Sequence, residues 1–494
     1  MLFLVVILLF SCSDQKQVMV IKETPKSRVI VLTDMLNEAD DSQTMVRLLM
    51  YANKFDIEGL IAVSSCHQYK GRNDTIPARN DVHPEEIVKF IDAYGAVREN
   101  LSLHEDGWPT SGYLLERVGQ GPSGFGMSDV GEGKSTTGSQ LIVNALLSDD
   151  PRPLYICINA GANCLAQALF DLRASNDQQR FRQLTEKLRV YDDAGQDDAG
   201  AWIAYYFKEI HYQRSQSQVF SFISNNGPVT WDSTMYPGMG QHAWARENIQ
   251  NDHGPLGELY PDRMKWKDPS TYSTLEGGGT STWIGHANHG LYVAEEMTWG
   301  GWGGRFDSVR KENITANQLR IWQMEDTEDP FKPFYMYGEA IDKWTDPITG
   351  ISYNEAGTAI YRWRRAYQND IEARMDWCVK PYNEANHNPV SAFNGDKTDG
   401  IVFITARGGA KIILDASASS DPDGDSLAYR WYTYPEAGNF MGKSDIADAL
   451  SPLATYTVPL DAPEGQIHII LEVCDHNEII SLFDYRRIVL NITK

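Results

Sequence analysis

The chain has 494 residues and a formal charge of −23, because 67 Asp and Glu residues outnumber 44 Lys and Arg residues. This length suits two or three domains, and a hydrophobic fraction of 42% argues against a mainly disordered chain. The excess of negative charge repels phosphate backbones, so we expect no nucleic-acid partner.

Residues 1–12 have the pattern of an export signal. The apolar run from Leu2 to Phe10 is uncharged and too short to cross a bilayer as a helix. The sequence Leu9-Phe10-Ser11-Cys12 resembles a bacterial lipobox, in which the cysteine becomes lipidated. We therefore predict a signal peptide over residues 1–12, lipidation of Cys12, and a linker over residues 13–27. The alternative is a buried N-terminal strand, against which the polar residues 13–26 argue.

This signal predicts a location in the bacterial cell envelope. The lipid on Cys12 would hold the protein to the outer membrane, either on its periplasmic side or at the cell surface. We expect this anchor to be its one contact with the membrane.

Residues 28–386 alternate between strand and helix patterns. Short apolar runs typical of buried strands lie at 29–32, 57–63, 154–158 and 188–191. Helical spacing lies at 41–53, from 84 onwards, and at 141–147, 164–172 and 201–210. This alternation predicts an α/β domain with a mostly parallel sheet covered by helices. In such sheets the ligand binds beyond the carboxyl ends of the strands.

Residues 387–494 have a different sequence pattern, without the alternation of strands and helices. Short strand-like runs separated by polar turns predict a small all-β sandwich, with strands at 411–414, 427–434, 454–458, 466–473 and 486–492. The segment from Leu414 to Asp425, followed by Tyr429-Arg430-Trp431, resembles polycystic-kidney-disease-type immunoglobulin-like domains. Its acidic turn, Asp421 to Asp425, is either a calcium-binding turn or a plain hairpin turn, and the sequence favours the hairpin.

The sharpest chemical signal follows the first strand of the α/β domain. Asp34, Asp40 and Asp41 lie between that strand and the next helix. Three crowded carboxylates are costly unless a cation neutralises them, and oxygen ligands suit calcium. The alternative is that one aspartate caps the helix, which leaves the other two unexplained. The sequence therefore predicts a calcium site, with the capping alternative left open.

This acidic segment resembles the fingerprint of nucleoside hydrolases, although the spacing to the Asp pair is two residues longer and the usual Gly is absent. The longer form resembles a bacterial family of nucleoside-hydrolase-like proteins, some of them labelled cellulose-binding. Further matching motifs are Gly161-Ala162-Asn163, Gln196-Asp197-Asp198, Glu276-Gly277-Gly278-Gly279-Thr280 and Trp299 to Phe306. The resemblance implies a nucleoside-hydrolase-type fold over residues 28–386.

The resemblance also implies roles for particular residues. Asp34 corresponds to the aspartate that touches calcium and acts as general base. Asp40, Asp41 and Glu276 correspond to further calcium ligands, and Asn163 corresponds to the position whose backbone carbonyl binds calcium. The implied mechanism is attack of a metal-activated water on an anomeric carbon.

The remaining assignments are those of the general acid and the substrate contacts. His67, His253, His286 and His289 are the candidates for protonating the leaving group, and His253 is our choice. The predicted substrate contacts are His67, Asn53, Asp197, Asp198, Trp302 and Arg305. Two alternatives stay open: Asp197 and Asp198 could instead cap the helix that begins at Ala199, and the Trp299 to Phe306 segment could be a tight loop packed against the core.

Three functions fit these residues. The first is an exported calcium-dependent glycosidase that hydrolyses an O- or N-glycosyl bond of a carbohydrate. The second is a non-catalytic protein that binds a cellulose-like glycan. The third is a nucleoside N-ribosyl hydrolase.

Overall fold

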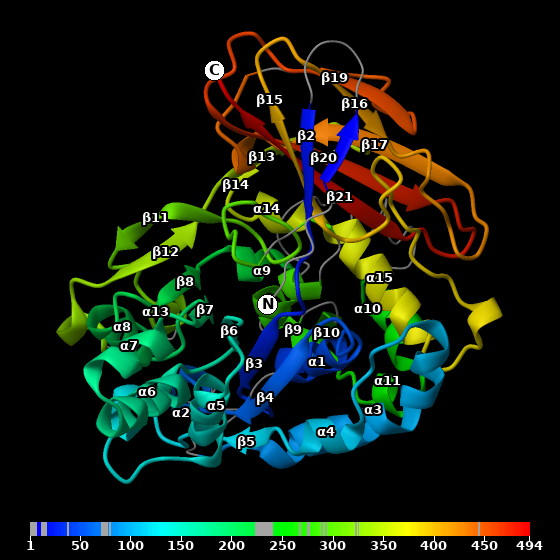
Figure 1. Ribbon diagram of the computed structural model, residues 1–494. Coiled ribbons are helices and arrows are strands. Elements are labelled where there is room, and N and C mark those ends of the chain that lie inside the picture. The colour runs from blue at the N-terminus through cyan, green and yellow to red at the C-terminus, as the bar shows by residue number, and fades with distance from the viewer. Residues whose placement is uncertain are drawn as a thin grey trace. The chain divides into compact units, whose positions relative to one another are not determined.

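The computed structural model describes residues 7–10, 17–36, 39–70, 78, 81–222, 241–265, 268–273, 277–287, 290–291, 294–321, 324, 326–442 and 445–494. The chain forms two compact units (Figure 1). The body unit comprises residues 26–287 and 303–362, and the tail unit comprises residues 1–25, 288–302 and 363–494. Each unit has its own core.

The body unit is built on an eight-stranded sheet in the order β11-β12-β8-β7-β6-β3-β4-β5 (Figure 1). Neighbouring strands are parallel, except that β11 runs antiparallel to β12. The strands are β3 (Arg28–Thr33), β4 (Asp56–Ala62), β5 (Val118–Gln120), β6 (Leu154–Ile158), β7 (Leu188–Asp193), β8 (His211–Ser215), β11 (Phe306–Glu312) and β12 (Tyr335–Glu339). The predicted mostly parallel α/β sheet is confirmed.

Strand order changes direction at β3. The chain passes from β3 to β4 and β5 on one side, and then returns to β6 on the other side of β3. Connections that leave in opposite directions open a crevice at the carboxyl ends of the two central strands. The residues that follow β3 and β6 therefore border the expected ligand site, and these are Asp34 and Asn159.

Helices cover both faces of this sheet, which is why all six residues of β3 are buried. On one face, α5, α6 and α8 share a core with Ile30, Leu32, Ile156 and Val190. The helices of the body unit are α1 (Ala39–Leu49), α2 (Cys66–Lys70), α3 (Pro84–His104), α4 (Ser111–Leu115), α5 (Thr137–Leu147), α6 (Asn163–Ser175), α7 (Gln178–Thr185), α8 (Ala199–Tyr206), α9 (Gln218–Phe222), α10 (Gln241–Ala245), α11 (Gly254–Glu258), α12 (Ser281–Ile284), α13 (Asn317–Ile321) and α14 (Thr358–Tyr361). Two hairpins complete the unit, β9 (Arg263–Lys265) with β10 (Asp268–Ser273) and β13 (Asp342–Thr345) with β14 (Ser352–Glu355).

The tail unit packs a six-stranded sheet on a three-stranded one. The larger sheet has the order β1-β2-β15-β21-β20-β17 and the smaller one the order β16-β19-β18. Their strands are β1 (Ile7–Phe10), β2 (Gln17–Lys22), β15 (Ile401–Ala406), β16 (Lys411–Asp415), β17 (Leu427–Thr433), β18 (Ile446–Ala447), β19 (Leu453–Thr457), β20 (Gly465–Asp475) and β21 (Phe483–Ile492). Residues of both sheets meet in one core, among them Leu414 and Tyr456 from the smaller sheet and Ile469 and Leu490 from the larger. Helix α15 (Arg364–Asp376) precedes this sandwich.

The unit boundaries differ from the predicted ones in two ways. Residues 13–27 are not simply a linker, because β2 pairs with β15 and places Met19 and Ile21 in the tail core. The tail unit also begins at Trp363 rather than at residue 387, and it includes residues 288–302. Both differences arise from pairing and packing between segments that are far apart in the sequence.

The structure describes only residues 7–10 of the predicted signal peptide. Residues 7–10 form β1, which pairs antiparallel with β2. Cys12 lies outside the described residues, so its lipidation and the envelope location stay predictions. Among the helices that the structure describes, none combines the length and apolar character needed to cross a bilayer.

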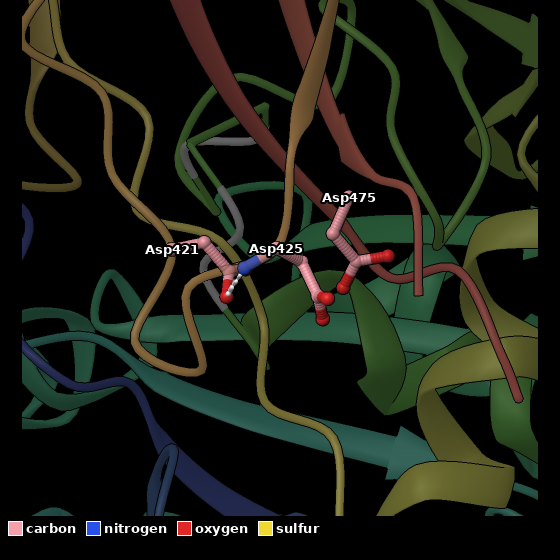
Figure 2. Close-up of side chains that lie close together, drawn as sticks. All are labelled: Asp421, Asp425 and Asp475. Carbon is pink, nitrogen blue, oxygen red and sulfur yellow. Dashed lines mark hydrogen bonds between the residues drawn. The ribbon is translucent and has the colours of Figure 1, made fainter. Parts of the chain in front are cut away.

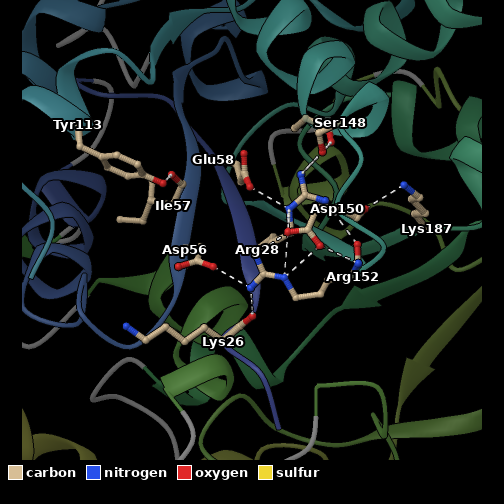
Figure 3. Close-up of polar contacts among 11 residues, drawn as sticks. Lys26, Arg28, Asp56, Ile57, Glu58, Tyr113, Ser148, Asp150, Arg152 and Lys187 are labelled. Atoms are coloured by element: carbon tan, nitrogen blue, oxygen red, sulfur yellow. Dashed lines mark hydrogen bonds and ion pairs between the residues drawn. The ribbon is translucent and has the colours of Figure 1, made fainter. Parts of the chain in front are cut away.

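A polar network lies at the amino-terminal edge of the body sheet, opposite the expected ligand site (Figure 3). Arg28, the first residue of β3, is 1% exposed. Its guanidinium donates to Glu58 Oε1 at 2.8 Å and to the carbonyl of Ala145 at 2.8 Å. The network therefore joins two strands to the end of α5 and serves stability rather than ligand binding.

Asp150 and Arg152 complete this network (Figure 3). Arg152 Nη2 lies 2.6 Å from Asp150 Oδ2, and Arg152 Nη1 lies 2.7 Å from Asp56 Oδ2. Hydrogen bonds from Arg152 lower the pKa of Asp150 from 3.8 to about 2. The carboxylate is thus favoured in its ionised form when the chain is folded.

We expect Asp150→Asn to lower the free energy of unfolding by about 0.5–1 kcal/mol at neutral pH, as for a partly exposed ion pair. Because the folded pKa is depressed, this contribution is present above pH 3.8 and is lost as the pH falls towards 2. Urea unfolding between pH 2 and 7 measures it, with the exposed neighbour Asp149→Asn as control. A difference from the parent protein that stays constant over this range contradicts the prediction.

Candidate functional site

Asp34 lies directly after β3, at the carboxyl end of the central strand. Its side chain is 2% exposed. Ser65, which follows the neighbouring strand β4, donates a hydrogen bond from its Oγ to Asp34 Oδ2. Two adjacent strand ends therefore fix this carboxylate at the crevice.

Asp41 reaches the same point from the first turn of α1. Thr33 Oγ1 donates to Asp41 Oδ1, so the last residue of β3 ties the helix to the strand. Burial raises the pKa of Asp41 well above its ordinary value, and the charges of Asp34 and Asp40 raise it further. The pair of buried carboxylates is thus destabilised as long as both are ionised and no cation is present.

The loop between the two aspartates turns sharply. Leu36 has a φ of 64°, a left-handed backbone conformation that costs a non-glycine residue energy. Asp40 and Asp41 both lie inside the first turn of α1, which begins at Ala39. The N-cap alternative therefore fails for both, although the helix N-terminus still favours their negative charge.

Asn163 begins α6, in the loop that follows β6. Its backbone N–H donates to Asp197 Oδ2 at 3.0 Å, and its Nδ2 donates to the carbonyl of Gly124 at 2.9 Å. The side chain is fully buried, and its Oδ1 has no hydrogen-bond partner. An unpartnered buried acceptor is costly, and a bound cation or water would satisfy it.

Two further amides border the same loops, and the sequence assigned no role to either of them. Gln196 Nε2 donates to the carbonyl of Asn159 at 2.7 Å, while Gln196 Oε1 has no partner. Asn159 Oδ1 accepts from Thr282 Oγ1 at 2.7 Å, and its Nδ2 has no partner. The sequence signal for Asn159 is its place directly after a buried strand, whereas the signal for Gln196 is the family-like motif Gln196-Asp197-Asp198.

Asp197 and Asp198 hold loops together rather than facing a substrate. Asp197 is 2% exposed, and its two oxygens accept the backbone N–H groups of Asn163 and Ala199. Asp198 Oδ1 accepts the N–H of Met127 at 2.8 Å. Burial raises the pKa of Asp197 to about 8 and that of Asp198 to about 6. The predicted sugar contacts are therefore corrected to a positioning role, and the Ala199 contact favours the helix-capping alternative for Asp197 because α8 begins at Ala199.

Trp302 and Arg305 are also not substrate contacts in this structure. Trp302 is 2% exposed and packs edge-on against Tyr367, with ring centroids 6.2 Å apart, inside the tail unit. Arg305 belongs to the body unit, where its Nε lies 2.6 Å from Asp342 Oδ1. A buried indole offers no open face for a sugar, and an ion-paired guanidinium already has its acceptor. The aromatic, glycine-rich loop is therefore structural.

Asn53 and His286 lie at the amino-terminal side of the strands, away from the expected ligand site at their carboxyl ends. Asn53 precedes β4, and its Nδ2 donates to Glu105 Oε2 at 2.8 Å. His286 Nδ1 lies 3.2 Å from the Oγ of Ser27, which precedes β3. Both contacts are at the amino-terminal side of the strands, so we remove Asn53 from the substrate contacts and His286 from the candidate acids.

Two candidate histidines, His67 and His253, are buried, and the other remaining predicted residues are not described by the structure. His67 is buried in α2, just after the carboxyl end of β4, on the side of the crevice. His253 is buried before α11, with its Nδ1 2.6 Å from the carbonyl of Asn251, and its role as general acid stays a prediction. Glu276, Cys12 and His289 lie outside the described residues.

The observed arrangement fits a hard cation. Asp34 and Asp41 supply buried carboxylate oxygens, Asp40 adds negative charge beside them, and Asn163 supplies an unsatisfied amide oxygen one loop away. Such oxygen-only donors suit calcium, which tolerates irregular geometry. The three aspartates do not all converge on one point, so the central pair is Asp34 and Asp41.

Comparison with known proteins agrees with this architecture. A solved structure, a nucleoside hydrolase-related hypothetical protein from Saccharophagus degradans that is associated with carbohydrate metabolism, is 33% identical and superposes with a TM-score of 0.79. The match covers 95% of this chain and all of that one. None of the curated proteins matches.

Two family models match the chain. The family described as cellulose-binding protein Sde0182, C-terminal domain, matches residues 411–492. The family described as cellulose-binding Sde182, nucleoside hydrolase-like domain, matches residues 28–306, which is more than half of the chain. The protein therefore belongs to the cellulose-binding Sde182 family with a nucleoside hydrolase-like domain.

Proposed function

We propose that the body unit is a calcium-dependent glycosidase of an exported protein and that its substrate is a carbohydrate. The observation that carries this proposal is the contact between the buried carboxyls of Asp34 and Asp41 at the point where the strand order changes direction. A structural role alone does not explain why two acids are held together away from water, since their repulsion costs stability. The family's cellulose-binding description supports a glycan as the ligand.

Asp34 and Asp41 would hold the cation, with Asp40 and Asn163 beside them. When bound, calcium supplies the positive charge that keeps both carboxylates ionised and lowers the pKa of a water. The unpartnered Asn163 Oδ1 supports this assignment, because its acceptor would otherwise stay unsatisfied. Glu276 is a further proposed ligand.

The chain's own groups then perform two tasks. Asp34, oriented by Ser65 Oγ, accepts the proton of the attacking water. The burial of Asp34 and Asp41 excludes bulk water from that proton transfer. Direct attack on the anomeric carbon through an oxocarbenium-like transition state would break the glycosyl bond and invert the configuration of that carbon. The leaving group would take its proton from a general acid, for which we propose His253.

The test is hydrolysis of a panel of plant and algal oligosaccharides, including cello-oligosaccharides, with calcium or with a chelator. On a cleaved glycan we expect Asp34→Asn to lower kcat by roughly 10²–10⁴, the usual contribution of a general base. Asp92→Asn on the exposed face of α3 is the matched control and should keep full turnover. Full turnover by Asp34→Asn would contradict the assignment of Asp34 as the general base.

Non-catalytic carbohydrate binding is the second candidate. The cellulose-binding family description favours it. Clear glycan binding by calorimetry, with no product after long incubation, would select it. Release of free base from inosine or uridine would instead select N-ribosyl hydrolysis.

A further inference from the structure

A second group of carboxylates lies in the tail unit, far along the chain from Asp34. Asp421 and Asp425 flank the turn between β16 and β17, and Asp475 ends β20 (Figure 2). One oxygen from each carboxylate lies within 4.8 Å of the other two. Two oxygens on opposite sides of one calcium ion lie about 4.6–5.2 Å apart, so a single ion can span this group.

The hydrogen bonds of the group leave acceptor oxygens unused. Asp421 Oδ1 accepts the backbone N–H groups of Asp423 and Asp425, at 2.8 and 3.0 Å, while the shielded Asp421 Oδ2 has no partner. Asp425 Oδ2 accepts from Asn477 Nδ2 at 2.8 Å. Within the described part of the chain, no Lys or Arg forms an ion pair with any of the three carboxylates.

Asp475 makes this arrangement costly. Its side chain is completely buried. Its Oδ1 accepts the N–H of Leu482 at 2.8 Å. A buried anion beside two other acids is unfavourable unless positive charge compensates it.

A neighbouring amide gives a separate indication of a ligand. Asn386 is 5% exposed, and its Nδ2 donates to Asp475 Oδ2 at 2.8 Å, which holds the amide against the acidic group. The same Nδ2 donates to the carbonyl of Ile480 at 2.8 Å. This fixes the orientation of the amide, because rotating it by 180° would place its oxygen against two acceptor oxygens. Asn386 Oδ1 has no partner. A buried acceptor without a hydrogen-bond donor destabilises the fold, and a bound cation would satisfy Asn386 Oδ1, because no surrounding side chain that the structure describes donates to it.

We propose that Asp421, Asp425 and Asp475, with Asn386 Oδ1, bind a structural calcium ion in the tail unit. The donors are all oxygen and carry three negative charges, which suits calcium rather than a softer metal. The ion fastens the turn at Asp421–Asp425 to the end of β20 and to the segment that follows α15. This site is independent of the body unit, and it selects the calcium-binding alternative for the acidic turn over the plain hairpin.

The first test is calorimetric titration of the full chain with calcium after chelation. We expect Asp425→Asn to weaken one of the bound calcium ions by roughly tenfold or more. Asp423→Asn is the matched control in the same turn, because the side chain of Asp423 contacts His387 and the substitution leaves its backbone N–H in place, so it should keep that ion. The ion must also remain in Asp41→Asn, which separates it from the proposed body site. An unchanged calcium count and affinity in Asp425→Asn would overturn the proposal.

A second measurement needs no substitution. The N–H groups of Asp423, Asp425 and Leu482 donate to the proposed ligands. Calcium should slow hydrogen exchange at these amides in the unmodified chain by about tenfold or more relative to chelator, because opening the turn would release the ion. Equal exchange rates at all three amides in calcium and in chelator would overturn the proposal even if the variants fail to fold.

Discussion

Asp41→Asn should abolish the stabilisation of the body unit by calcium, while leaving the chelated protein as stable as the parent or more stable. Calcium at about 100 times its dissociation constant stabilises a one-site protein by about 2.7 kcal/mol, and this gain requires the carboxylate. Without calcium, the substitution removes a buried charge that Asp34 and Asp40 repel. Thermal unfolding of both proteins with and without calcium measures the two effects.

The pH dependence gives the same prediction a second readout. Because the folded pKa of Asp41 is raised above its ordinary 3.8, the folded state binds the proton more tightly than the unfolded state does. The chelated parent should therefore lose stability as the pH rises from 3.8 through the raised pKa. Asp41→Asn should lose this dependence, and calcium should bind the parent more tightly as the pH rises through the same range.

The control for this prediction is Asp92→Asn, which removes one exposed carboxylate from α3. It should keep both the calcium response and the pH dependence of the parent. If Asp41→Asn gains as much from calcium as the parent does in a background without the tail site, Asp41 is not a ligand.

Arg214→Met should cause the largest loss of stability in the body unit, about 3–5 kcal/mol. The Arg214 guanidinium lies 2.8 Å from Asp192 and 2.7 Å from Glu328, and all three side chains are at most 2% exposed. Removing it leaves two buried carboxylates without a countercharge. Chemical unfolding of the purified chain, followed by a probe of the body unit, measures the loss.

Arg182→Met is the matched control, since it also removes an arginine from an ion pair. Arg182 lies 3.0 Å from Glu186, but the two side chains are 70% and 52% exposed. Its loss should cost less than about 0.5 kcal/mol. Equal effects of the two substitutions would contradict a stabilising role for the buried ion pairs of Arg214.

The α/β fold and the position of Asp34 at the carboxyl end of a central strand were predictable because their signals are local. A buried strand followed at once by an acid marks the ligand edge of a parallel sheet, and that rule identified Asp34. The strand β8 escaped prediction because it contains His211, Gln213 and Arg214, whose polarity hides a buried strand. Arg214 is buried there only because Asp192 and Glu328 come from other segments.

The errors concern partners that are distant in the sequence. In the sequence, nothing indicates that Asp197 has a hydrogen-bond partner. In the fold, the backbone N–H of Asn163 donates to its carboxylate. The sequence leaves the loop at Trp299 open between a sugar-stacking loop and a structural loop. The structure favours the second, because Arg487 of β21 donates to the carbonyl of Gly300 at 2.7 Å and lies over the Trp299 ring. Such long-range contacts leave no periodic or spacing signal, so local pattern alone does not reveal them.

The most direct test of a cation at Asp34 and Asp41 is a calorimetric calcium titration of chelated full-length protein that carries Asp425→Asn, which removes the proposed tail site. We predict that one calcium ion still binds, and that adding Asp41→Asn eliminates it while Asp92→Asn does not. No calcium binding in the Asp425→Asn protein, or the same binding after Asp41→Asn is added, would contradict the account.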